Sequence, residues 1–112
     1  METITWNDFE KINIRVGTII EAKVFEKAKR PAYQLLIDFG SEIGLRKSSA
    51  QITDLYNVND LIGKQIIAVI NFPVKQIANF FSECLVLGAV DENKQVILLQ
   101  ADRKVENGLK IA

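Results

Sequence analysis

Apolar and polar residues alternate along several separate stretches of this chain, which is the pattern of strands that bury one face. The alternation predicts six strands, in chain order Ile12–Phe25, Tyr33–Phe39, Ile43–Ser49, Gln65–Ile70, Cys84–Val90 and the shorter Gln95–Gln100. Gly17 interrupts the first strand, and a glycine inside a strand often marks a bulge or a sharp bend. We therefore expect a long first strand that bends at Gly17, as a small barrel requires at its corners.

Two segments without strand alternation predict short helices. Thr5–Glu10 is expected to form a helical turn capped by Thr5 or Asn7, because both side chains can accept a bond from the first free backbone N–H groups. Ala50–Leu61 predicts one or two helical turns over an open end of the sheet, and Gly63 ends this segment.

Five principal strands, a helical plug between the third and the fourth, and a glycine-bent first strand are typical of the five-stranded Greek-key OB-fold barrel, an all-β fold. A short N-terminal helix precedes the barrel. Leu109–Ala112 follows the turn signal Asn107-Gly108 and is expected to add a short C-terminal β extension. An SH3-like barrel is the nearest alternative, but it usually lacks such a plug. The 112 residues suit one domain, 1–112, with one core.

In an OB-fold, ligands bind on the outer face of strands two and three and on the loops that join strands one-two and four-five. Here those loops are Glu26–Ala32 and Asn71–Phe81, and Val74–Phe81 is expected to be a long functional loop. Both loops are locally basic. The basic candidates for ligand contact are Lys27, Lys29, Arg30, Arg46, Lys47 and Lys75. Arg46 and Lys47 are neighbours on one strand, so only one of them can face outward.

The fourth and fifth strands carry apolar side chains on both faces. A small barrel buries only one face of a strand, so the second face needs cover from the terminal segments or from another subunit, which predicts a homodimer. An apolar groove around the four-five loop is an alternative ligand surface. It would bind polypeptide segments through Phe72, Pro73, Ile77 and Phe80. Stacking on nucleic-acid bases and packing within the loop or a dimer seam are the other roles open to Phe80.

The composition argues against an enzyme. The chain has no histidine, which removes the commonest general base, the commonest zinc ligand and every Ser-His or Cys-His nucleophile pair. It also has no glycine-rich phosphate loop and no metal-ligand cluster, so we expect no catalysis, no cofactor and no bound metal. The one cysteine, Cys84, lies in an apolar run and is expected to be a buried thiol.

Charge and hydropathy limit which partners and which cellular location are expected for this protein. Fourteen basic and fourteen acidic residues give no net charge, which argues against a generic polyanion binder but allows a local basic patch. The N-terminus has no signal-peptide pattern, and no apolar run approaches the roughly 20 residues that span a bilayer. We therefore expect a cytoplasmic protein without membrane insertion.

Three motifs in a fixed order carry a resemblance to a known family. They are Asp8–Gly17, Ser48–Ile52 and the stretch from Asn71-Phe72-Pro73 to Ser82–Gly88. Together they resemble the family of free-standing tRNA-binding domains, and within it the branch of CsaA-type secretion chaperones, over essentially the whole chain. The same domain occurs as an appendage of methionyl-tRNA and phenylalanyl-tRNA synthetases.

The resemblance implies an OB-fold homodimer that binds tRNA and, for the chaperone branch, unfolded or pre-export polypeptides. It assigns tRNA contact to the motif positions, which here are Ser48, Ser49, Gln51, Asn71, Lys75, Ser82 and Glu83. Family members commonly have two adjacent basic residues after Asn-Phe-Pro, whereas this chain has only Lys75 in Val74–Gln76. Polypeptide binding is the alternative function.

Overall fold

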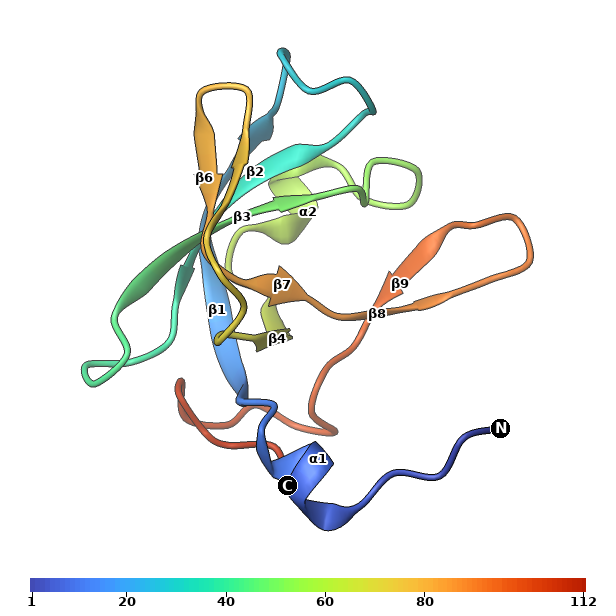
Figure 1. Cartoon of the computed structure of the whole chain (residues 1–112). Coiled ribbons are helices and arrows are strands. Elements are labelled where there is room, and N and C mark those ends of the chain that lie inside the picture. Colours follow the sequence, from blue (N-terminus) through green and yellow to red (C-terminus); the bar gives the residue numbers. More distant parts are fainter.

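A five-stranded antiparallel sheet forms the centre of the computed structural model, which describes residues 1–112 (Figure 1). The strand order is β3-β2-β1-β4-β7, and β3 lies against β6 and β7, so the sheet curls into a nearly closed barrel. The sheet strands are β1 (Ile14–Val24), β2 (Tyr33–Asp38), β3 (Leu45–Ala50), β4 (Gln65–Val69) and β7 (Leu85–Val86). The OB-fold prediction is confirmed.

Two short helices and two hairpins lie outside the five-stranded sheet. They are the helices α1 (Trp6–Glu10) and α2 (Val58–Leu61), the hairpin of β5 (Lys75–Ile77) and β6 (Phe80–Ser82), and the hairpin of β8 (Gly88–Val90) and β9 (Val96–Leu98). No helix is long and apolar enough to cross a membrane.

β1 is the strand on which the sheet is assembled, because it pairs with β4 through Ile14–Thr18 and with β2 through Thr18–Val24. The register shifts between Ile19 and Glu21, so the strand bulges at Ile20 and not at Gly17 as predicted. Gly17 serves close packing instead. A Cβ there would lie 2.7 Å from the side chains of Ile37 and Phe39, which fill that space.

The core confirms the alternation on β2, where Tyr33, Leu35 and Ile37 are buried and the residues between them are partly exposed. The predicted helical plug is present as a single turn, Val58–Leu61. Leu61 is fully buried within the core cluster, so the plug covers the core as predicted.

Two predictions about the second half of the chain are wrong. Val74–Phe81 was expected to be a loop, but most of it belongs to the β5–β6 hairpin, which turns through Ala78 with a positive φ of 53°. Cys84–Val90 was expected to be one strand, but it divides at Leu87 into β7 and β8. The division occurs because the partner changes: β7 pairs with β4, whereas β8 pairs with β9.

Both terminal elements that the sequence predicted, the capped helical turn and the C-terminal β extension, are present. Thr5 caps α1, accepting a bond from the Asp8 N–H while the Asp8 carboxylate accepts one from the Thr5 N–H. After the Gly108 turn, the C-terminal segment runs along β1 as an edge, where the Ile111 N–H donates to the Ile14 carbonyl.

Candidate functional site

The β5–β6 hairpin is fixed to β3 at its root by side chains as well as by backbone. The Glu83 N–H donates to the Lys47 carbonyl (2.8 Å), and the Lys47 N–H donates back to the Glu83 carboxylate (2.9 Å). The Ser49 N–H donates to the Ser82 hydroxyl (3.2 Å). The motif residues Ser82 and Glu83 therefore close the barrel on β3, and we call this contact the β3 seam.

Ser48 lies inside the protein beneath the β3 seam. Its side chain is 1% exposed, and its hydroxyl donates to the Cys84 carbonyl (2.9 Å), so a ligand on the surface does not reach it. Cys84 is buried beside it, as predicted. Burial raises the pKa of the Cys84 thiol from 9.0 to about 11, which keeps the thiol protonated and weakly nucleophilic at neutral pH.

Asn71 and Arg46 also make contacts within the fold. The Asn71 amide accepts a bond from the Asn13 N–H (2.9 Å) and donates one to the Lys11 carbonyl (2.7 Å), which ties the end of β4 to the segment after α1. Arg46 is half-buried, and its guanidinium donates to the Ile70 carbonyl (3.3 Å). Of the neighbours Arg46 and Lys47, it is Lys47 that reaches the outer face of the sheet.

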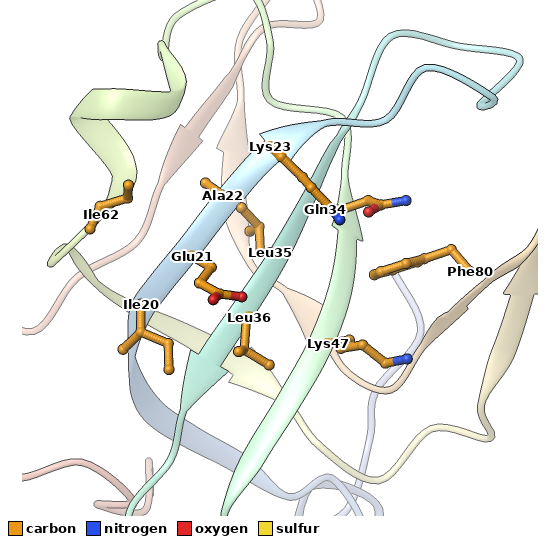
Figure 2. A pocket seen from close by; sticks show the side chains of 10 residues that line it. All are labelled: Ile20, Glu21, Ala22, Lys23, Gln34, Leu35, Leu36, Lys47, Ile62 and Phe80. Atoms are coloured by element: carbon orange, nitrogen blue, oxygen red, sulfur yellow. The ribbon is translucent and has the colours of Figure 1, made fainter.

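The outer face of β1, β2 and β3 carries a hollow of about 640 Å³ (Figure 2). Lys47 and Phe80 lie at one end of this outer-face hollow and Ile62 at the other. The Lys47 ammonium stands 5.4 Å from the centre of the Phe80 ring, a cation–π distance. Lys23 and Gln34, which pair across β1 and β2, also line the hollow.

A second groove of about 510 Å³ lies between the end of β3 and β7, and residues of both hairpin strands line it. Most of its lining is apolar, no acidic residue lines it, and Lys75 is its one cationic residue. Four predicted tRNA-contact residues and three predicted peptide-contact residues meet there: Ser49, Gln51, Lys75 and Ser82, with Phe72, Pro73 and Ile77. We call it the seam groove. Phe80, the fourth peptide candidate, lines the outer-face hollow instead.

The basic loop between β1 and β2 stands beside the hairpin (Figure 1). Lys27, Lys29 and Arg30 are exposed on it. The residues at the base of the loop, Phe25 and Ala32, pack with Phe80 in a small buried cluster separate from the main core. The loop that carries Lys27, Lys29 and Arg30 is therefore in contact with the hairpin that carries Lys75.

Sequence reasoning missed Lys23 and Gln34, which line the outer-face hollow with Lys47. The signal for Gln34 was available, since it alternates with the buried Tyr33 and Leu35 on β2 and must face outward. Lys23 could not be placed, because the bulge at Ile20 changes the strand's alternation after that point. No group of three or more His, Cys, Asp and Glu side chains could hold a metal ion.

Comparisons with known proteins agree on one family. The family described as "Putative tRNA binding domain" matches residues 14–110. A methionine–tRNA ligase of Methanocaldococcus jannaschii is 33% identical over 99% of this chain, and the chain spans only 17% of that enzyme's length. The solved CsaA chaperone structures from Picrophilus torridus and Bacillus anthracis are 57% and 50% identical, each with a TM-score of 0.93. Their alignments cover 98% and 99% of this chain and 100% of each of those chains.

The neighbouring serines of the motif provide a matched pair for testing which residues hold the fold. Ser48→Ala should lower the free energy of unfolding by about 1–3 kcal/mol, because the buried Cys84 carbonyl loses its closest donor. Ser49→Ala should stay within about 0.5 kcal/mol of the wild type, because the hydrogen bond of Ser49 to the hairpin uses its backbone N–H. Urea unfolding measures both changes, and equal stabilities of the two variants would contradict this assignment.

Proposed function

This chain belongs to the putative tRNA-binding domain family, and we propose that it binds structured tRNA non-covalently, without catalysing a reaction. The observation that carries the proposal is the grouping of cations from three separate segments around one hairpin. Lys75 lies on the hairpin itself, Lys47 beneath it on β3, and the basic loop of Lys27, Lys29 and Arg30 beside it. A chain with no net charge thus has a local basic surface.

In the proposed mechanism, exposed cations contact the phosphates and polar groups set the register. Phosphate contacts supply sequence-independent affinity, while Ser49, Gln51 and Gln34 offer hydrogen bonds to sugar or base edges. The motif residues Ser82 and Glu83 act through the fold by holding the root of the hairpin on β3. Asn71, Arg46 and Ser48 also act through the fold, since their side chains bond to the backbone of Lys11, Ile70 and Cys84. We place this activity in the cytoplasm, where tRNA is the available ligand.

Titrating total tRNA into the labelled protein at several salt concentrations tests the tRNA proposal. Fluorescence anisotropy should report binding that weakens steeply as salt rises, since each phosphate contact releases counterions. Lys75→Ala should weaken binding and reduce the salt slope by about 0.7–0.9, the share of one phosphate contact. Lys104→Ala is the matched control, because Lys104 lines a different hollow. Absence of binding at low salt would refute the proposal.

A second candidate function is the binding of unfolded polypeptides in the seam groove. The apolar lining of this groove favours it, with Phe72 56% exposed at the surface. Solved structures that match this chain over almost its whole length are described as CsaA chaperones. An extended chain could place apolar side chains against Phe72, Pro73 and Ile77 while Lys75 contacts an acidic group of the same chain.

A permanently unfolded polypeptide, reduced and carboxymethylated, tests the second function in the same anisotropy assay. Phe72→Ser should weaken binding by about tenfold or more, because burying a phenylalanine is worth roughly 1.5–3 kcal/mol. Phe81→Ser is the control, since Phe81 is also exposed but points away from the barrel. Binding should persist at high salt, in contrast to tRNA binding. Equal affinity of Phe72→Ser and the wild type would exclude the seam groove.

We further propose that two copies of this chain associate through the β8–β9 hairpin. This hairpin projects from the barrel (Figure 1). It exposes the apolar side chains of Ile97, on β9, and of Leu99, directly after β9. An unpaired apolar surface of this kind is typical of an interface between subunits.

Sedimentation analysis of the wild type should therefore give twice the mass of one chain. Ile97→Asp should shift the protein to the monomer, because a carboxylate buried in an apolar interface is strongly unfavourable. Leu55→Asp, a change at an exposed leucine before α2, should leave the dimer intact. A monomeric wild type would rule out the association.

A further inference from the structure

The basic loop and the β5–β6 hairpin share a hydrophobic cluster of their own. Phe25 and Ala32 come from the two ends of the loop, and the Phe25 N–H donates to the Ala32 carbonyl (3.0 Å), which closes the loop at its base. Phe80 of the hairpin packs on both, with the Phe25 and Phe80 ring centres 5.4 Å apart. Ala28 of the loop and Ile77 of the hairpin add partly buried contacts.

This cluster is separate from the main core of the barrel. The thirteen residues of the main core include none of its members, so the outer parts of the loop and the hairpin are held chiefly by each other. The hairpin has a second attachment at its root, the β3 seam, whereas the loop continues the β1–β2 ladder. Stability is local in such satellite clusters, and losing the central residue frees the segments without unfolding the core.

Phe80 is the residue that joins the parts. Its ring packs against Phe25, and the same ring lies 5.4 Å from the Lys47 ammonium. It is only 9% exposed, so its contribution to a ligand surface is made mainly through the residues that it holds. One side chain therefore contacts the base of the basic loop, the hairpin and the outward-facing lysine of β3.

We propose that Phe80 is a positioning residue that locks the basic loop, Lys47 and the hairpin into one preorganised clamp. The cations of the three segments then meet the ligand in a fixed relative arrangement, and the cost of ordering them is met during folding rather than during binding. This inference rests on the proposed tRNA binding for its functional part. Its structural part, the coupling of loop and hairpin, stands independently of any ligand.

The test compares Phe80→Ala with Phe81→Ala, a change at the adjacent phenylalanine on the opposite face of the hairpin. Limited trypsin digestion, read by mass spectrometry, follows cleavage after Lys27 and Lys29 in the absence of tRNA. Phe80→Ala should accelerate this cleavage by about tenfold or more, because the open state of the loop becomes more populated. Phe81→Ala should digest like the wild type. Circular dichroism confirms that the barrel remains folded, and Phe80→Leu replaces Phe80→Ala if it does not.

The tRNA titration supplies the functional readout. Phe80→Ala keeps every charge, so it should raise the dissociation constant by about tenfold while the salt slope stays close to that of the wild type. Lys75→Ala, by contrast, should reduce the slope. Circular dichroism under the titration conditions must show a folded barrel, because a smaller folded fraction would also raise the apparent dissociation constant without changing the slope.

The outcomes separate the two claims. Unchanged cleavage of the loop in Phe80→Ala overturns the clamp, whatever tRNA does. Faster cleavage with unchanged tRNA affinity overturns the positioning role. If the wild type binds no tRNA, the proposed function fails, and faster cleavage in Phe80→Ala would still support the coupling of the loop to the hairpin.

Discussion

The β3 seam is the constraint on which the surface of this protein depends. β3 is an edge of the five-stranded sheet, and it meets the chain again at Ser82 and Glu83 through two bonds to side chains and one between backbones. A regular backbone ladder would pair a further strand along β3. Here side chains accept two of the bonds from β3, so the residues before Ser82 can leave the sheet as the β5–β6 hairpin. The closure of the barrel and the projection of the hairpin therefore have the same cause.

The β5–β6 hairpin borders both hollows, since Phe80 lines the outer-face hollow whereas Lys75, Ile77 and Ser82 line the seam groove. Cations and apolar side chains occur in both, with Lys23 and Lys47 in the hollow and Lys75 in the groove. Charge contacts to a polyanion weaken with salt, whereas apolar contacts to a polypeptide do not. One fold can thus offer surfaces to both ligand classes, with Lys75 and the hairpin as the shared element.

Much of the fold and part of the candidate site could be predicted from the sequence. Alternation correctly placed the strands of the first half and the buried face of β2, and the capping pair Thr5 and Asp8 placed α1. The motif positions remain predictions as ligand contacts, because a motif does not say whether a residue contacts a ligand or holds the fold. Ser48 and Asn71 illustrate the difference, because both make hydrogen bonds to distant backbone groups.

On β2 the sequence by itself determined which side chains face the core, because a period of two along an unbulged strand is a local property. It also determined that this is a chain without histidine and without net charge. Only the tertiary structure decided the bulge at Ile20, the β3 seam and the packing of Phe25 on Phe80. Each of these depends on which distant segment becomes the neighbour, as in the bond between Lys47 and Glu83 across 36 positions. Local patterns carry no information about that choice, which is made by the packing of the whole barrel.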